Sequence, residues 1–238
     1  MREKILPRQT YLEHTQNHIH VEFCTPHQVI SSAVLNGGIV QASHLVNLRV
    51  PKRWASLESP EITLAKYCAD AGWSGTIVGM MTVASMDSFR IVKETVQGID
   101  IVVLVTSGLS NPRRVGDRAE HRKMITQSKE IGTINIMVMT STTLTGPAMV
   151  EALTIATEAK SAALQESGIR SPVSNKIATG TGTDSIAIVS GHGPETVRYC
   201  GKHVLFGEIL GRLVTDAVTS SIDWGLAHAS GANVRTGK

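Results

Sequence analysis

The sequence predicts one α/β domain, built on a mixed β-sheet that is flanked by helices and includes an N-terminal β-hairpin. Short apolar runs typical of strands alternate with longer runs of helical spacing, which is the pattern of an α/β protein. Residues 28–35 and 39–50 are β-rich and are joined by Asn36-Gly37-Gly38, whose residue types tolerate the positive φ angles of a hairpin turn. With 238 residues, 42% of them hydrophobic, the chain can bury one full core.

Composition and charge exclude several classes of protein. The chain has 23 basic and 20 acidic residues, and their signs are interspersed instead of forming the basic stripe of a nucleic-acid-binding protein. No stretch of about 18 apolar residues could span a membrane, and the N-terminus lacks the apolar core of a signal peptide. Cys24, Cys68 and Cys200 are odd in number and widely spaced, as expected for free thiols in a reducing compartment. We therefore expect a cytoplasmic protein that binds neither nucleic acid nor membranes.

The two ends of the chain are expected to lie outside the folded domain. Residues 1–16 are predicted to be a polar leader, residues 17–224 the domain, and residues 225–238 a flexible tail.

The first strand of the domain is expected at residues 17–24, where polar and apolar side chains alternate. Its polar face carries His18, His20 and Glu22, and such pairs of imidazoles hold metal ions in hydrolases. No second cluster of histidine and carboxylate supports this hypothesis, and a single zinc ion usually needs three protein ligands. We predict no metal-binding residues. Whether the protein needs a divalent ion stays open at this point.

The remaining strands are predicted from short apolar runs. Residues 87–96 fit either a helix or a strand, because both periodicities are present. Central strands are expected at residues 76–82, 100–106 and 133–140, which are almost entirely apolar.

Three helices are predicted. The first, over residues 59–71, opens with a serine cap and a proline in the first position. The longest, over residues 145–168, has a face of alanines that lets it lie close to the sheet. The last, over residues 205–224, carries Gly207 and Gly211 one turn apart, so another helix, a flat ligand or a second subunit of a homodimer could pack closely there.

The run Thr179-Gly180-Thr181-Gly182-Thr183-Asp184 is the strongest candidate for a ligand-binding loop. It presents backbone amides, three hydroxyls and one carboxylate within six residues. It is not a Walker loop, since no Gly-Lys-Ser/Thr follows, and it is not a dinucleotide fingerprint, because a strand follows it instead of a helix. A turn in which the threonines bond only their own backbone is the alternative.

Asp184, Lys202 and His203 are candidates for chemistry. Lys202 and His203 precede the last helix, and a helix N-terminus can hold an anion or a developing oxyanion. His203 is a candidate general base or acid, because histidine is the side chain most often used for proton transfer near neutral pH. Asp184 is its expected carboxylate partner, because one strand and a turn separate them. The alternative is an ordinary helix start with two exposed side chains.

Two further loops contain candidate binding residues. Asn36, with Gly37 beside it, could orient a substrate amide, although an Asn-Gly-Gly sequence is often only a turn. Asn111 and Asp117 lie in the loop over residues 107–117, after a central strand, where ligands bind in open α/β sheets.

Seven segments in one order along residues 31–224 carry a family resemblance. They are LNGG (35–38), VGMMTVASM (78–86), TSGLSNPRRVGD (106–117), GTINIMVMT (132–140), MVEALTIATEAKSAAL (149–164), SPVSNKIATGTGTDSIAIVSG (171–191) and GKHVLFGEILGR (201–212). Each is weak alone, but together they resemble the adenosylcobinamide amidohydrolase family.

The resemblance implies an enzyme of corrinoid salvage, which forms part of coenzyme B12 synthesis. Such an enzyme hydrolyses the amide between aminopropanol and a propionate side chain of adenosylcobinamide, and releases adenosylcobyric acid. On this hypothesis, backbone amides of the 179–184 run or of the last helix would stabilise the oxyanion, and Asp184 or His203 would activate water. Thr183 as a covalent nucleophile is an alternative.

The predicted site divides into two sets of residues. Asp184, His203 and Thr183 are the catalytic candidates. The substrate-binding candidates are Asn36, Gly37, Asn111, Asp117, Thr179, Gly180, Thr181, Gly182 and Lys202.

Two other functions stay open: a protein that binds a corrinoid without cleaving it, and a nucleotide-binding α/β protein. The absence of a loop lysine counts against the second.

Overall fold

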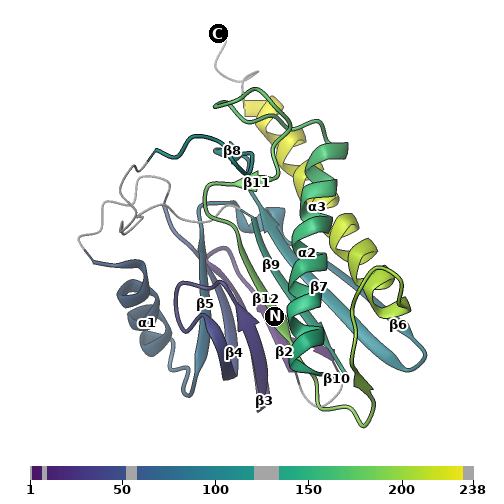
Figure 1. Ribbon diagram of the computed structural model, residues 1–238. Helices are drawn as coiled ribbons and strands as arrows, with labels where there is room; N and C mark the ends of the chain where they lie inside the picture. Colours follow the sequence, from purple (N-terminus) through teal and green to yellow (C-terminus); the bar gives the residue numbers. More distant parts are fainter. Residues whose placement is uncertain (1, 7–9, 52–57, 121–133, 233–238) are drawn as a thin grey trace.

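The computed structural model describes residues 2–6, 10–51, 58–120 and 134–232, and it confirms an α/β fold with a large mixed sheet flanked by helices (Figure 1). The helices are α1 (Pro60–Asp70), α2 (Gly146–Glu166) and α3 (Leu205–Ala232). The strands of the main sheet are β1 (Arg2–Leu6), β2 (Thr10–His14), β3 (His18–Ser31), β4 (Gly38–Arg49), β5 (Ile77–Thr82), β6 (Arg90–Val96), β7 (Ile99–Ser107), β9 (Ile134–Thr140) and β12 (Ser185–Val189). Two small sheets pair β8 (Pro112–Arg113) with β11 (Gly180–Thr181), and β10 (Thr143–Leu144) with β13 (Thr196–Val197).

The hairpin of β3 and β4 joins two parts of the main sheet. One part contains β12, β9, β7 and β6, and the other contains β5. One edge of β3 pairs with β2 through residues 19–23 and with β12 through residues 29–31, while its other edge pairs with β4. The register of β3 against β4 shifts between Glu22 and His27, where the strand can bend. The sheet is mixed as predicted, because β9 runs parallel to β12 and β4 runs parallel to β5, whereas the other neighbours are antiparallel.

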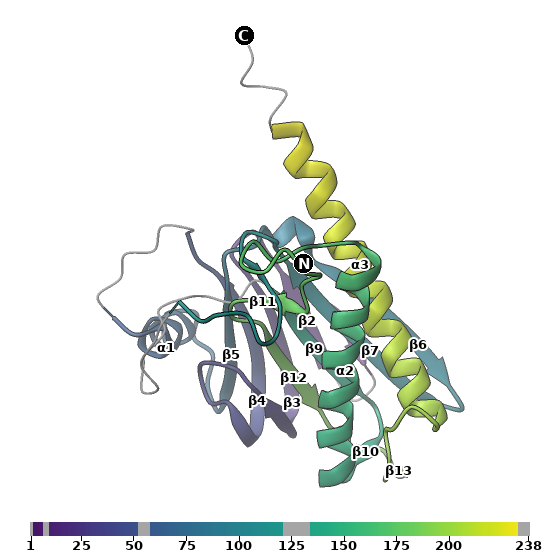
Figure 2. The same cartoon turned by 45° about the horizontal axis from the view of Figure 1, so that its top comes forward.

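Three hydrophobic clusters define the layers. The inner cluster joins side chains of β2 and β3, such as Leu12 and Val21, to side chains of β7 and β9, such as Leu104 and Met137, so the sheet curls around its own core. The opposite face of β7, β9 and β12 is covered by α2 and α3, which lie side by side (Figure 2). The outer face of β4 and β5 is covered by α1.

The α2 helix packs closely because its buried face is made of small side chains, as its sequence predicts. Ala152, Ala156, Ala159 and Ala163 are all buried. On α3, a Cβ at Gly211 would lie 3.6 Å from Cγ2 of Ile155, which is on α2. This glycine face therefore packs against other elements of the same chain.

The N-terminal residues correct the expectation of a polar leader. Residues 1–16 include β1 and β2, which extend the sheet from β3 (Figure 1). Ile5, Leu6 and Leu12 are buried, and Leu12 lies opposite Val21 of β3. The composition of this segment is polar overall, but β2 has one apolar face. That face is buried because β2 pairs with β3. Residues 1 and 7–9 lie outside the described part of the chain.

The C-terminal helix also differs from its predicted length. It was expected to end at residue 224, but α3 continues to Ala232, and Nδ1 of His228 donates a hydrogen bond to the carbonyl of Trp224 at 2.7 Å. Gly225 does not end the helix, because an isolated glycine costs only about 1 kcal/mol relative to alanine. Residues 225–232 are therefore helical, and residues 233–238 lie outside the described part.

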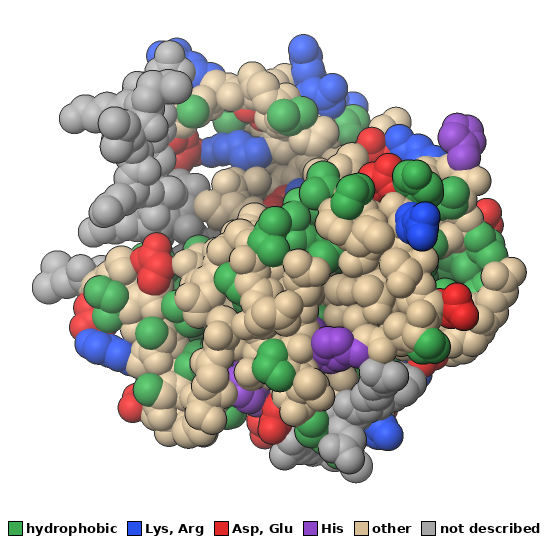
Figure 3. Space-filling view, turned by 60° about the horizontal axis from the view of Figure 1, so that its bottom comes forward, with side chains coloured by type: hydrophobic (Ala, Val, Ile, Leu, Met, Phe, Trp, Pro, Cys, Tyr) green, Lys and Arg blue, Asp and Glu red, His purple; other side chains and the backbone are tan. Residues whose placement is uncertain are grey.

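The remaining elements follow the sequence closely. The structure confirms the predicted strands at 76–82 and 100–106, and the described part of the one at 133–140, as β5, β7 and β9. The ambiguous segment 87–96 is mostly strand β6, preceded by a short 3₁₀ turn at Met86–Ser88. The β3–β4 connection is the predicted hairpin, with Asn36 at φ 51° and Gly38 at φ 90°. On the face shown in Figure 3, acidic and basic side chains are interspersed.

Candidate functional site

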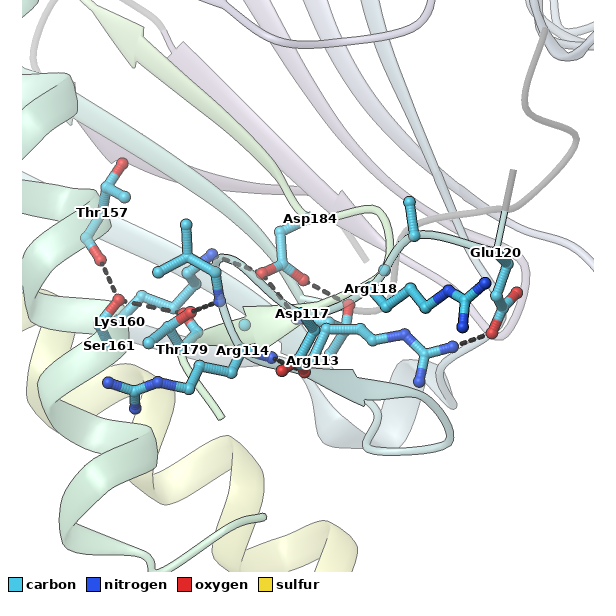
Figure 4. A pocket seen from close by; sticks show the side chains of 15 residues that line it. Arg113, Arg114, Asp117, Arg118, Glu120, Thr157, Lys160, Ser161, Thr179 and Asp184 are labelled. Atoms are coloured by element: carbon cyan, nitrogen blue, oxygen red, sulfur yellow. Dashed lines mark hydrogen bonds and ion pairs between the residues drawn. The ribbon is translucent and has the colours of Figure 1, made fainter. Parts of the chain in front are cut away.

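A cavity of about 620 Å³, lined mostly by polar and charged residues, lies beside α2, between the loop that follows β7 and the 179–184 run (Figure 4). The helix contributes Thr157, Lys160 and Ser161 to its lining. The other walls come from residues 113–120 and from the threonine- and glycine-rich run. Two segments that are about 65 residues apart in the sequence thus form one site.

Backbone pairing brings these two segments together. In the β8–β11 sheet, Gly180 lies opposite Arg113, and the amide of Thr179 donates to the carbonyl of Arg113 at 2.9 Å. The hydroxyl of Thr179 accepts a hydrogen bond from the amide of Val115 at 2.9 Å. Ser161 anchors the run to α2, because its hydroxyl lies 3.0 Å from the carbonyl oxygen of Thr179. The hydrogen bonds of Thr179 thus hold the run to two other segments, and other residues of the run line the cavity.

Asp184 and Lys160, which both line the cavity, form an ion pair. Both side chains are only 9% exposed. The carboxylate of Asp184 also accepts hydrogen bonds from the amide of Thr181 at 3.0 Å, the hydroxyl of Thr181 at 2.5 Å and the amide of Ile134 at 3.3 Å. The site thus contains a buried carboxylate whose oxygens are held by donors from three segments of the chain.

Asp117 is a second carboxylate on the cavity wall. Its Oδ2 accepts a hydrogen bond from the hydroxyl of Ser171 at 2.5 Å and another from the amide of Arg114 at 2.9 Å. These hydrogen bonds, that of Ser171 above all, lower the pKa of Asp117 from 3.8 to about 2. Asp117 is therefore ionised at neutral pH and fastens the 113–117 loop to residue 171.

The cavity also carries several cations. Arg113 pairs with Glu120, and Nη1 of Arg114 donates to the carbonyl of Ile177 at 2.9 Å. Arg118 lines the same cavity. Together with Lys160, these groups suit a ligand rich in carbonyl oxygens or other acceptors.

The structure brings together six of the predicted site residues. Lining the one cavity are Asp117, Thr179, Gly180, Thr181, Gly182 and Asp184. Thr183 is not part of the lining, and its hydroxyl is buried without a hydrogen-bond partner among the described residues. Asn111 lies immediately before β8, in the loop that leads to the cavity.

Four predicted residues lie elsewhere. Asn36 donates from Nδ2 to the carbonyl of Ile77 at 2.8 Å, and Gly37 turns so tightly that a Cβ would lie 2.3 Å from the carbonyl oxygen of Ala33. Lys202 pairs with Glu158, and neither Lys202 nor His203 lines the cavity.

Asp184 and His203 are not joined in this structure. The chain leaves β12 at the end opposite Asp184 and passes through β13 before it reaches His203. The described partners of Asp184 are Lys160, Thr181 and Ile134. Their proximity in the sequence predicts an Asp184–His203 pair. In the structure, β12 and β13 separate the two residues, and they lie in different parts of the fold.

Lys160 is the main residue that sequence reasoning missed. A signal was present, because Lys160 lies four residues after Ala156 and three before Ala163, on the apolar face of α2. A lysine at such a position must have a partner when it is buried. Its carboxylate partner is 24 residues away, and helical periodicity gives no information about it.

His18 and His20 of β3 belong to a separate cluster of ring side chains. His20 stacks on Trp73 with ring centroids 3.8 Å apart, and its Nε2 lies 3.0 Å from Nδ1 of His44. Nδ1 of His18 lies 2.8 Å from the hydroxyl of Tyr67, and burial lowers the pKa of His18. Within the described ranges there is no group of three histidine, cysteine, aspartate or glutamate side chains arranged to hold a metal ion.

The fold and the cavity define an α/β protein with a buried charged pair in its candidate site. Comparison with known proteins then assigns the chain to a family. The chain belongs to the adenosylcobinamide amidohydrolase family, whose model matches residues 4–228. This confirms the resemblance carried by the seven segments.

Individual relatives match this chain at low sequence identity. An uncharacterized protein of Methanocaldococcus jannaschii is 36% identical over 157 residues, which cover 60% of this chain and 61% of that protein, less than two thirds of its length. Adenosylcobinamide amidohydrolases of Methanosarcina mazei and Halobacterium salinarum are 26% and 25% identical over 204 and 191 residues. These matches cover 82% and 79% of this chain, and 88% and 77% of the relatives.

Among the residues described, none of the helices has the length and apolar character needed to cross a bilayer.

Proposed function

We propose that this protein hydrolyses the amide between aminopropanol and a propionate side chain of adenosylcobinamide, giving adenosylcobyric acid and aminopropanol. The match of the family model over residues 4–228 is the observation that carries this proposal. The polar cavity supports it, because hydroxyls, cations and carboxylates converge there as an amide substrate requires. We further propose a cytoplasmic location, which the three free thiols support.

Hydrolysis of an amide needs three kinds of group. A base must activate water, donors must stabilise the oxyanion, and an acid must protonate the leaving amine. In our proposal the arm of the corrinoid enters the cavity while the macrocycle stays at its mouth. Arg118 lines the cavity and is proposed to bind a carbonyl oxygen of the substrate, and Arg113 is proposed to do so through donors that its ion pair with Glu120 does not use.

Asp184 is the proposed carboxylate for water activation, because it lies inside the cavity. To accept a proton it must exchange one of its present donors for the attacking water. His203 remains a proposed acid or base, and it would reach the substrate from outside this cavity. The buried hydroxyl of Thr183 is the proposed alternative nucleophile.

The direct test is incubation of the purified protein with adenosylcobinamide. We expect mass spectrometry to detect adenosylcobyric acid and aminopropanol in equal amounts. Asp184→Asn and His203→Ala, each shown to be folded by circular dichroism, test the two assignments, and His228→Ala on the far part of α3 is the control. Unchanged ligand with a shifted visible spectrum would instead identify a corrinoid-binding protein and refute hydrolysis.

A trapping experiment separates two mechanisms of attack. If Thr183 is the nucleophile, intact-protein mass spectrometry after rapid quenching will detect an acyl-enzyme, and Thr183→Ala will abolish it. If water attacks directly, oxygen-18 water will label the acid without a covalent intermediate. A melting shift with nucleotides, together with absence of cleavage, would favour the nucleotide-binding alternative.

A further inference from the structure

Lys160 is an unusual residue in its place. It lies on the alanine-rich face of α2 that packs against the sheet, and the whole residue is 7% exposed. No other lysine in the described parts of the chain is buried. An ammonium group in such a position is destabilising unless a charged partner and further hydrogen bonds compensate for its lost hydration. The partner is Asp184, so the contact is built into the fold and is not an incidental surface pair.

Gly180 makes the contact possible. A Cβ at this position would lie 2.3 Å from Oδ2 of Asp184 and 2.9 Å from Nζ of Lys160. The first of these separations is shorter than any side chain tolerates, so the carboxylate or the loop would have to move. A glycine is therefore required here for close approach, although its φ is ordinary.

The paired carboxylate fastens several walls of the cavity at once. Through Oδ2 it holds Lys160 of α2 and the amide of Thr181, and through Oδ1 it holds the hydroxyl of Thr181 and the amide of Ile134 at the start of β9. Asp184 itself precedes β12. Removal of the ammonium would leave a carboxylate buried with only polar, uncharged donors.

We infer that Lys160 is a positioning residue of the candidate active site, which holds Asp184 and the 179–184 run in place through the space left by Gly180. The inference deepens the proposed function, on which its catalytic consequence rests. Lys160 need not touch the substrate, because it acts through the carboxylate and the loop. Its loss should therefore lower kcat more than it raises KM.

Stability measurements test the contact without any assumption about activity. Lys160→Met should lower the urea midpoint, because it leaves the largely buried carboxylate of Asp184 without a positively charged partner. The double variant Lys160→Met/Asp184→Asn should recover part of that loss, because no unpaired charge remains. Lys66→Met removes an exposed lysine that pairs with Glu58, and it should leave the midpoint unchanged. An unchanged midpoint for Lys160→Met, or a further loss in the double variant, would overturn the inference.

Activity measurements test the catalytic consequence. With adenosylcobinamide, folded Lys160→Met should lose about 100-fold in kcat, as expected when a reacting group is displaced by about 1 Å, and KM should change little. Gly180→Ala keeps both charges and should reduce kcat in the same direction, whereas Gly201→Ala, where a Cβ meets open space, should not. The double variant with Asp184→Asn should be no slower than the slower single variant.

The outcomes separate the two proposals. If the wild type cleaves the substrate and folded Lys160→Met retains its kcat, Lys160 does not position the site and the inference fails. If the wild type does not cleave, the proposed function fails, and the stability cycle alone decides whether Lys160 holds Asp184. Restoration of kcat in Lys160→Ala by added ethylammonium, but not by sodium at equal ionic strength, would support the ammonium as the active feature.

Discussion

Asn135 donates a hydrogen bond from its Nδ2 to Oδ1 of Asn47 at 2.8 Å, and so links β9 to β4 across the interior of the curled sheet. Asn47 in turn donates to the hydroxyl of Thr106 on β7 at 2.7 Å. Nδ2 of Asn135 also lies 3.0 Å from the carbonyl of Met81 on β5. All three polar side chains are buried, so they can find partners only among one another and the neighbouring backbone.

Replacement of Asn47 by alanine tests this network. The change removes the acceptor of one Asn135 hydrogen bond and the donor to the hydroxyl oxygen of Thr106 in the interior, which should lower the free energy of unfolding by about 1–3 kcal/mol. Urea denaturation followed by circular dichroism measures the loss. Asn17→Ala, on the exposed turn before β3, is the matched control and should change stability little. A wild-type midpoint for Asn47→Ala would show that the network contributes nothing.

Two glycines of α3 should respond in opposite directions to alanine. At Gly207 a Cβ would lie 2.2 Å from the carbonyl oxygen of Gly201 and 2.3 Å from that of Cys200, and backbone atoms cannot move aside cheaply. At Gly211 the nearest atom is Cγ2 of Ile155 at 3.6 Å, an ordinary contact. We expect Gly207→Ala to lower the melting temperature, and Gly211→Ala to raise it through a gain of up to about 1 kcal/mol in helix propensity. Equal effects at both positions would contradict the packing described.

The three thiols should react at very different rates in the folded protein. Burial raises the pKa of Cys200 to about 12 and that of Cys68 to about 11, whereas Cys24 is exposed. Because the thiolate is the reactive form, iodoacetamide at pH 8 should label Cys24 first. Mass spectrometry of peptides gives the extent at each site, and labelling in urea is the control that should equalise them. Early labelling of Cys200 would mean that its environment is open.

Acid should release the loop that Asp117 fastens. The folded pKa of Asp117, about 2, is below its ordinary value of 3.8, so its stabilising contribution is complete above about pH 4 and is lost as the pH falls toward 2. Ser171→Ala removes the largest cause of this shift, and the acid transition should then begin at higher pH. Circular dichroism between pH 2 and 5 measures the transition. Ser110→Ala, in an exposed part of the same loop region, should leave it in place.

The fold was largely predictable from local patterns, because strands and helices leave period 2 and period 3.6 in the sequence. The strand at β7 and the helix at α2 fall where apolar runs and the alanine face placed them. The N-terminal strands were missed, since the apolar face of β2 is short and acquires meaning only beside Val21. The end of α3 differs from the predicted residue 224, because the helix continues through Gly225 to Ala232.

The candidate site was predictable only in part. The 179–184 run and Asp117 share a cavity, as loops rich in turn residues and hydroxyls allow. Whether Asp184 has a catalytic role stays a prediction, as does any role of His203. Lys160 could have been noticed from its place among alanines, but its partner could not have been identified, because the contact spans 24 residues and depends on how α2 lies over β12.

By itself the sequence determined the α/β class, most of its elements, the family and the polar run that ends at Asp184. Only the tertiary structure decided which polar and charged side chains become partners. Asn47 lies 88 residues from Asn135, and both become neighbours only because the sheet curls until its two parts face each other. Local sequence patterns encode which face of an element is apolar, whereas the pairing of distant polar groups is set by the path of the whole chain.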